Sequence, residues 1–322
     1  MSRKRTKNKY AKYGYLFSLP FIITFLVFTL YPIIYTFRIS FSDLHGVATG
    51  DINILANPFE NYTAIWNNRT FRTSLNNTVM LWLFNFIPQI VLATALAAWF
   101  TSKQLRLKGG GFFKTLFYMP NIITAASIAI LFGALFGAPT GPLNDLFYRL
   151  GFIDGPVHWF RNPVTARATV SFIQFWMWYG STMIIMIAGI NGINPALFEA
   201  SAIDGANGIQ TFFRVTLPQL KPIALFTLVT SFIGGMQMFD IPMLLVDRSG
   251  PDNATLTTAV FIFNQAFGGG RLWNRAAAAS VILFIVCSII AGGLFFLFRD
   301  KDAIAIEKAK KQAMKELRKE NA

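Results

Sequence analysis

Six long stretches of this 322-residue chain contain no charged side chain, and they limit the possible folds more than any other feature. They cover residues 13–37, 73–102, 115–144, 168–198, 222–239 and 276–298. A helix that crosses a bilayer core of about 30 Å needs about 20 apolar residues. The fifth stretch is interrupted by Asp240 but continues as an apolar segment to Val246. We therefore predict an all-α integral membrane protein with six transmembrane helices, at about residues 15–37, 76–100, 115–136, 168–190, 222–246 and 276–298.

The overall composition agrees with a lipid environment, since 54% of the residues are hydrophobic and only 14% are charged. A net charge of +14 is also compatible with nucleic-acid binding. The aromatic side chains, however, lie inside the apolar stretches rather than beside the lysines, so we expect no nucleic-acid partner.

The distribution of basic residues predicts the orientation in the membrane. Alternate connecting segments carry 20 Lys and Arg residues on one side and 9 on the other. Basic residues accumulate on the cytoplasmic side, so both termini are predicted to be cytoplasmic. Residues 1–14 then form a basic N-terminal segment, residues 15–298 the membrane domain, and residues 299–322 a basic tail. Within that tail, Lys308 to Lys319 are expected to form a helix near anionic headgroups.

Several local features follow from the same pattern. The first apolar stretch is too long for a signal peptide and is expected to remain as an anchor. The external segment 137–167 should contain a short helix at Leu143 to Leu150, and the segment Ala259 to Phe267 is apolar enough to dip into the membrane. Cys287, the one cysteine, excludes an intrachain disulfide and is expected to pack inside the last span.

The sequence offers no catalytic constellation. The run from Gly109 to Thr115 contains contiguous glycines and a Phe pair rather than the spaced glycines of a phosphate-binding loop. The only histidines, His45 and His158, lie in predicted external loops without neighbouring ligand residues. We therefore predict no enzymatic activity, no metal site and no cofactor on this chain.

The predicted cytoplasmic segment 191–221 is the most informative part of the sequence. Asn194 is a good helix N-cap, Pro195 suits the first helical position, and Gly205 can adopt the left-handed conformation that ends a helix. These signals predict a short helix from 195 to 204. Its small side chains would let another protein surface approach closely, although an amphipathic helix lying on the bilayer would show the same local pattern.

A motif in this segment resembles a known signature. Glu199-Ala200-Ser201, then Gly205, then Val215-Thr216-Leu217-Pro218 is similar to the EAA signature of ABC importer permeases, with Ser201 and Val215 in place of the usual Ala and Ile. The resemblance implies that the segment docks onto an ATPase. The residues that would carry this coupling are Glu199, Ala200, Ser201, Asp204, Gly205, Leu217 and Pro218.

The resemblance extends over most of the chain and points to the maltose-permease-like sugar branch. Similar stretches are Tyr118-Met119-Pro120, the set Gly141, Asn144, Trp159 and Pro163, and Gly250-Pro251 followed by Thr257 and Ile262-Phe263-Asn264. It implies the type I ABC importer permease fold in a bacterial cytoplasmic membrane. The implied partners are a second homologous permease, two ATP-binding subunits that hold ATP and Mg, an extracellular sugar-binding protein and the sugar itself.

A sugar site needs aromatic platforms beside amide or hydroxyl groups. In the fourth span Gln174, Trp178 and Ser181 recur at helical spacing, at positions similar to sugar-contacting ones in maltose-type permeases. In the fifth span Ser231, Gly235 and Gln237 lie near similar positions, and Gly234-Gly235 is expected to loosen the helix. The alternative is that these residues pack against the partner permease.

Two other functions fit parts of the sequence. An ion-coupled secondary transporter would use charges inside its spans, and Asp240 is the one candidate. A related importer could instead carry glycerol phosphate or another small solute, since the external binding protein largely sets the cargo.

Overall fold

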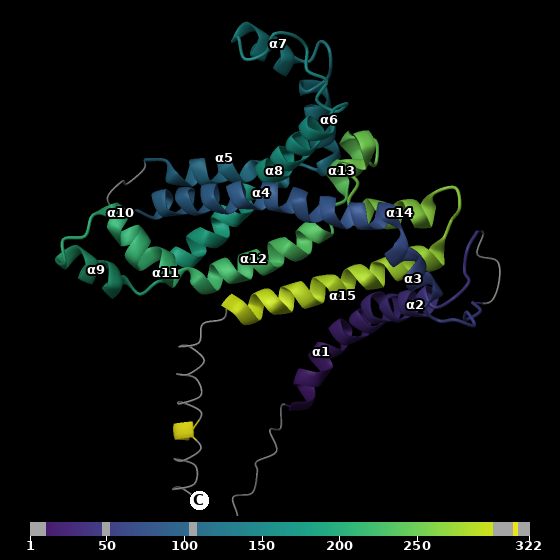
Figure 1. Ribbon diagram of the computed structural model, residues 1–322. Helices are drawn as coiled ribbons and strands as arrows, with labels where there is room; N and C mark the ends of the chain where they lie inside the picture. Colours follow the sequence, from purple (N-terminus) through teal and green to yellow (C-terminus); the bar gives the residue numbers. More distant parts are fainter. Residues whose placement is uncertain (1–10, 47–51, 103–107, 299–311, 315–322) are drawn as a thin grey trace, which may run out of the picture. The chain divides into compact units, whose positions relative to one another are not determined.

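The computed structural model describes residues 11–46, 52–102, 108–298 and 312–314 (Figure 1). The regular secondary structure of the described residues is helical, apart from an isolated β-bridge between Ser42 and Ile54. Its helices are α1 (Ala11–Phe25), η1 (Leu26–Leu30), α2 (Tyr31–Ser40), α3 (Glu60–Asn67), α4 (Arg69–Thr101), α5 (Gly110–Ile122), α6 (Ala125–Leu135), α7 (Pro142–Arg149), α8 (Pro163–Asn191), α9 (Pro195–Ile203), α10 (Gly208–Thr211), η2 (Phe212–Thr216), α11 (Leu217–Gln219), α12 (Lys221–Met236), α13 (Asp240–Leu245), η3 (Pro251–Asn253), α14 (Thr258–Phe267) and α15 (Trp273–Phe298).

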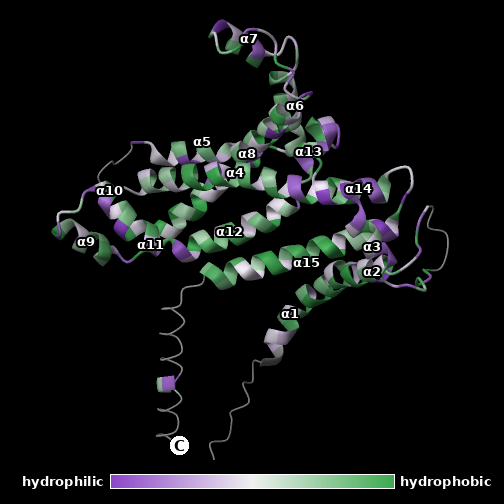
Figure 2. Cartoon of the chain, viewed as in Figure 1, coloured by the Kyte–Doolittle hydropathy of each residue, from purple (hydrophilic) through white to green (hydrophobic). Residues whose placement is uncertain are grey.

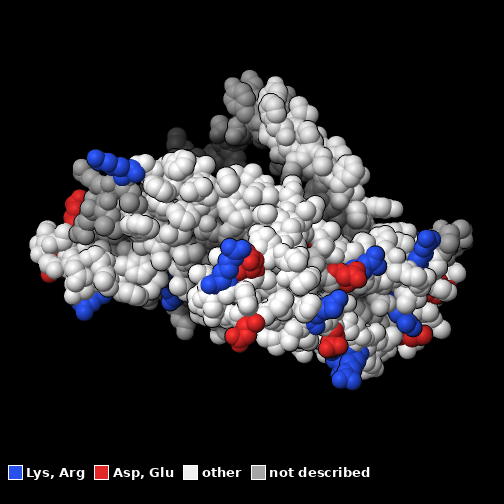
Figure 3. All heavy atoms as spheres, turned by 90° about the horizontal axis from the view of Figure 1, so that it is seen from above, with Lys and Arg blue, Asp and Glu red and all other residues white. Residues whose placement is uncertain are grey.

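The described helices supply five segments long and apolar enough to cross a membrane, and a bent pair brings the number to six. The five are Tyr13–Ser40, Arg69–Thr101, Pro163–Asn191, Lys221–Leu245 and Trp273–Phe298. Figure 2 shows apolar residues along most of their length. In Figure 3, the charged side chains of the visible face are scattered over a mostly uncharged surface. The prediction of an all-α membrane protein is confirmed. The predicted termini lie outside the described residues, except for 11–14 and the helical residues 312–314.

The predicted third span is not one straight helix. α5 and α6 meet at an angle of 92°. Ile123 and Thr124 have extended backbone conformations, and the Thr124 hydroxyl accepts a hydrogen bond from the Ser127 N–H at 3.3 Å. Thr124 is therefore an N-cap that starts a new helix. The sequence correctly predicted an apolar membrane segment here, but it did not reveal that Thr124 starts a second helix within it.

The predicted fifth span is also interrupted. α12 ends at Met236, and residues 237–239 form a turn before α13 begins at Asp240. The helix continues through Gly234-Gly235, where loosening was expected, and ends one residue after them, with the Gly234 and Gly235 carbonyls accepting from Gln237 and Met238.

Two short π-helical turns, η1 and η2, each end two residues before a proline. Tyr31, which precedes Pro32, donates its N–H to the Leu26 carbonyl. Leu217, which precedes Pro218, donates to the Phe212 carbonyl in the same way. A proline ring clashes with the carbonyl four residues earlier, and a widened turn relieves that contact. Other prolines, such as Pro88 in α4, lie in α-helices without a π-helical turn before them.

By contacts, the chain divides into two compact units: Met1–Phe71 with Ile262–Phe284, and Arg72–Phe261 with Ile285–Ala322. In the first unit, Asn61 is buried and connects α3 to the end of α2 and the start of α15. Its amide donates to the carbonyls of Ser40 (3.0 Å) and Ser42 (2.8 Å), and its oxygen accepts from Asn274 at 3.1 Å. These contacts fix the loop that follows the first span.

The second unit contains an unusually close helix contact between α5 and α8. A Cβ atom placed on Gly180 would lie 2.3 Å from the Phe117 carbonyl oxygen and 2.9 Å from the Tyr118 Cα. Asn121 in α5 also donates to the Met177 carbonyl at 3.4 Å. Small residues at helix crossings allow backbones to approach closely in membranes. Gly180 therefore sets the distance between these two helices.

Buried asparagines organise the loops of the second unit. Asn144, in α7, accepts from the Trp159 indole N–H at 2.9 Å and from the Val157 N–H at 3.2 Å, and it donates to the Val157 carbonyl at 3.1 Å. The predicted short helix at Leu143 to Leu150 is confirmed within a residue at each end.

A second asparagine connects α4, α8 and the segment before α14. Asn77 donates to the Asn253 carbonyl at 2.6 Å and accepts from the Arg167 guanidinium at 3.2 Å. Arg167 also donates to the Ala254 carbonyl at 3.0 Å. These bonds satisfy both ends of the buried amide.

Candidate functional site

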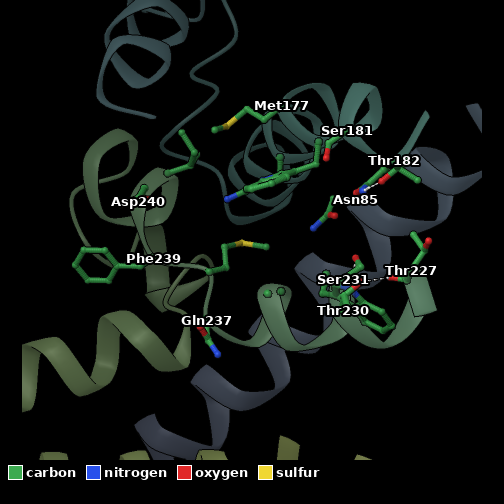
Figure 4. A pocket seen from close by; sticks show the side chains of 18 of the residues that line it. Asn85, Met177, Ser181, Thr182, Thr227, Thr230, Ser231, Gln237, Phe239 and Asp240 are labelled. Carbon is green, nitrogen blue, oxygen red and sulfur yellow. Dashed lines mark hydrogen bonds between the residues drawn. The ribbon is translucent and has the colours of Figure 1, made fainter. Parts of the chain in front are cut away.

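A pocket with a volume of about 310 Å³ lies between α4, α8, α12 and the turn that leads into α13 (Figure 4). We refer to it as the α8–α12 pocket. All six residues predicted for a substrate pathway line it, although they come from two separate parts of the sequence: Gln174, Trp178, Ser181, Ser231, Gly235 and Gln237. In Figure 4, Ser181 and Thr182 approach the pocket from α8, while Thr227, Thr230 and Ser231 approach it from α12.

The α8 wall combines an indole with an amide. Trp178 is 48% exposed, so much of its ring surface is available to a ligand. Its indole N–H donates to the Gln174 side-chain oxygen at 3.2 Å. This bond fixes the indole orientation and leaves the ring face free, which suits stacking on an apolar surface.

The α12 wall is shaped by a tryptophan from another helix. Trp82 of α4 donates its indole N–H to the Ser231 hydroxyl at 3.2 Å and packs edge-on against Phe232, with ring centroids 5.2 Å apart. A Cβ on Gly235 would lie 2.2 Å from the Trp82 ring. Gly235 therefore makes room for an indole, a role different from the helix loosening expected from sequence.

Sequence reasoning overlooked the contribution of α4. Trp82, Asn85 and Gln89 all line the pocket, and Gln89 donates to the Thr182 hydroxyl at 2.7 Å, which connects α4 to α8. These three residues recur at spacings of three and four, the same signal that identified the α8 residues. Applying that criterion to the second span as well would have found them.

The chemistry of the pocket is that of amides, hydroxyls and aromatic rings. Such a lining can hydrogen-bond hydroxyl groups and stack on apolar ring faces. Asp240, at the start of α13, is the one charged residue among the described residues that line it. The arrangement provides binding groups rather than a paired acid and base.

The second candidate site is the loop from α9 to α11. The Asn194 side chain accepts from the Ala196 N–H at 3.0 Å, Pro195 begins the helix, and Gly205 has a left-handed φ of +73°. The predicted short helix is confirmed, ending one residue earlier than expected. Apart from its chain neighbours, no atom of the described residues lies within 4 Å of a Cβ built on Gly205, so the backbone conformation rather than space favours glycine there.

The predicted coupling residues do not share one surface. Ser201 is buried within the loop, where its hydroxyl donates to the Phe198 carbonyl at 2.8 Å and lies 3.4 Å from the Thr211 hydroxyl. It therefore holds the loop together. Of the Ala-Ser pair that was expected to face a docking partner, Ala200 is exposed and Ser201 is not. The exposed members of the set are Glu199, Ala200, Asp204, Gly205, Leu217 and Pro218.

A further pocket of about 440 Å³ lies on the inner side of this loop. Ser201 and Glu199 line it together with Thr101, at the end of α4, and Phe212 of η2. A cavity therefore lies beneath α9, and the end of the membrane-spanning helix α4 forms part of its wall.

Residues 14–301 match the family described as "Binding-protein-dependent transport system inner membrane component". The arabinooligosaccharides transport system permease protein AraP of Bacillus subtilis is 33% identical over 273 residues, covering 84% of each chain. The lactose transport system permease protein LacF of Rhizobium radiobacter is 30% identical over 301 residues, covering 93% of this chain and 98% of its own.

Solved structures show the same fold. A chain of a bacterial ABC transporter involved in the import of the acidic polysaccharide alginate matches with a TM-score of 0.75 and 22% identity, covering 88% of this chain and 94% of its own. A chain of the alginate transporter in complex with alginate pentasaccharide-bound periplasmic protein matches with a TM-score of 0.73 and 24% identity, covering 88% and 93%. The family match and the apolar helices make this a multi-pass protein of the cell membrane. The chain belongs to the family of inner-membrane components of binding-protein-dependent transport systems.

Proposed function

We propose that this chain is a permease subunit of an ATP-driven importer and that it carries oligosaccharides through the α8–α12 pocket. The observation that supports this most is the gathering of all six predicted pathway residues around one pocket of amides, hydroxyls and indoles. The names of the relatives AraP and LacF refer to arabinooligosaccharides and lactose, which supports sugar as the cargo class.

The proposal includes partner proteins for the rest of the translocation path, for ATP hydrolysis and for cargo delivery. A second homologous permease completes the translocation path, two ATP-binding subunits hold ATP and Mg and perform hydrolysis, and an extracellular sugar-binding protein delivers the cargo. This chain itself acts as a transport subunit without an ATPase site. The alginate transporter bound to a periplasmic protein is consistent with such an assembly.

The proposed topology places both termini and the α9–α11 loop in the cytoplasm, on the basis of the charge asymmetry. Single cysteines at Ser2, Lys108 and Lys315 in a Cys287→Ala background should react with an impermeant thiol reagent only from the cytoplasmic side. Cysteines at Asn61 and Asn162 should react only from outside, with the exposed loop position Asn53 as a control for the buried Asn61. External labelling at Lys108 would overturn this topology.

The proposed coupling element is α9, which would dock into a cleft of the ATPase and transmit its closure to the spans. Glu199 is exposed, so it is available to pair with a basic group there. Glu199→Lys should abolish transport and the stimulation of ATP hydrolysis by the binding protein. Gln219→Lys, which places the same lysine at another exposed position of the loop, is the control. Normal stimulation in Glu199→Lys would contradict the docking role.

The decisive test of the cargo path is to change Trp178→Ala and Gln174→Ala separately in the assembled complex. Sugar uptake should fall while stimulation of ATP hydrolysis by the binding protein persists, because only the cargo contacts are removed. Trp99→Ala, which removes an exposed indole outside the pocket, controls for loss of aromatic surface. Unchanged uptake in both pocket variants would refute this pathway.

A further inference from the structure

The α8–α12 pocket has an uneven electrostatic character. Its lining contains many neutral polar groups but one formal charge, the carboxylate of Asp240, and neither Lys nor Arg is among its described lining residues. The cavity wall contributed by this chain is therefore negative. The fold alone does not dictate the charge of the cargo, since an importer of an acidic polysaccharide shares it.

Asp240 also has an ordinary structural role. It occupies the first turn of α13, where a carboxylate interacts favourably with the helix dipole. The dipole explains why a carboxylate is tolerated at this position, but it does not provide that charge with a cationic partner. The ion pair found among the described residues joins Arg149 to Asp145, and Asp240 itself is exposed. Because this carboxylate lines the pocket, its field extends into the cavity, although solvent screens part of it.

We propose that Asp240 makes this pocket select against anionic cargo, so that neutral oligosaccharides pass and sugars bearing carboxylate or phosphate groups are disfavoured. This inference rests on the proposed function, because it assigns the cargo's charge class to that same pathway. It also argues against glycerol phosphate as the cargo. A like charge placed in a partly desolvated cavity raises the free energy of the bound state, and no described lining residue provides a compensating cation.

The local potential can be measured without knowing the cargo. Thr230 lines the pocket and is exposed, and its hydroxyl donates to carbonyls of its own helix, at Phe226 and Thr227. Thr230→Cys in a Cys287→Ala background provides one reporter thiol. Its rates of reaction with a cationic and an anionic methanethiosulfonate of similar size would be compared in the purified complex, each normalised to the rate with a small free thiol.

The expected result is a strong preference for the cationic reagent that Asp240→Asn removes. For a unit charge about 10 Å from the reporter thiol and an effective dielectric constant of about 40, the reaction rate of each reagent changes about fourfold. Because the two reagents respond in opposite directions, their rate ratio should fall about sixteenfold. Asp240→Glu should preserve the ratio, and Asp247→Asn, a nearby acid outside the lining, should leave it unchanged. A ratio that Asp240→Asn does not alter would overturn the inference.

A transport measurement separates this inference from the proposed function. The complex would be tested with a neutral oligosaccharide and with the same oligosaccharide carrying one uronate, after binding of each to the binding protein is measured. The uptake ratio of uronate to neutral sugar, corrected for that binding, should rise in Asp240→Asn. Failure to transport any sugar would refute the proposed function, whereas equal uptake of both sugars by the unsubstituted complex would refute charge selection alone.

Discussion

The contact between α5 and α8 leads to a quantitative prediction for Gly180→Ala. The new methyl group would lie 2.3 Å from the Phe117 carbonyl oxygen, roughly 1 Å short of ordinary contact, and 2.9 Å from the Tyr118 Cα. Both obstacles are backbone atoms, which cannot rotate away as a side chain could. Relief therefore requires the two helices to separate, which would weaken the packing of Phe117 against Tyr179 across the same crossing.

The expected magnitude follows from two opposing effects. Overpacking in a well-packed interior costs typically about 1–3 kcal/mol, and the backbone obstacles place this site at the upper end. Replacing a helical glycine by alanine gains up to about 1 kcal/mol in helix propensity. The net destabilisation of Gly180→Ala should thus be about 2 kcal/mol.

Gly234→Ala is a matched control, because it makes the same chemical change in a membrane-spanning helix where, beyond the local helix backbone, no atom of the described residues lies within 4 Å of the new Cβ. It should be neutral or slightly stabilising. The assay is thermal denaturation of the purified complex in one detergent, followed by tryptophan fluorescence, with both variants measured in parallel. Equal midpoints for the two variants would refute the argument that a close backbone contact at Gly180 determines the α5–α8 distance.

Three further outcomes are expected from local geometry. Gly205→Val should reduce coupled transport because a β-branched residue is strained at a φ of +73°, by about 1–2 kcal/mol, whereas Gly205→Asn should be milder; equal transport by both would contradict this account. Asn77→Leu should lower the denaturation midpoint by removing the acceptor of Arg167, a loss of about 1–3 kcal/mol, and Arg167→Leu should cost less in that background than alone, because only its bond to the Ala254 carbonyl is then left to lose. Asn144→Asp should keep the bond from the Trp159 indole but lose donation to the Val157 carbonyl, so it should perturb the tryptophan fluorescence less than Asn144→Leu.

The sequence predicted the membrane-spanning helices well because apolar length is a local property. α8 and α15 extend only a few residues beyond their predicted bounds. The breaks were harder to foresee. The bend at Thr124 depends on one hydroxyl cap within an unbroken apolar run, and hydropathy does not register such a cap.

The candidate site was predictable where polar residues recur on a helix face. The α8 set was found in this way, and the same spacing in α4 was available but unused. What could not be read from sequence is the direction in which a small residue points. Ser201 looked like a docking residue but is buried in its own loop, and Gly235 looked like a flexible point but accommodates Trp82. Both outcomes depend on side chains distant in sequence.

The π turn at Leu26–Leu30 has a practical consequence for mapping the first span. A π turn holds one residue more than an α-helical turn, so it rotates everything after it by about 100° relative to a regular helix. A helical wheel drawn continuously from Tyr13 to Ser40 would therefore assign α2 residues to the wrong side. Cross-linking or lipid-accessibility positions in this span should be chosen from two separate wheels, one ending at Phe25 and the other beginning at Tyr31.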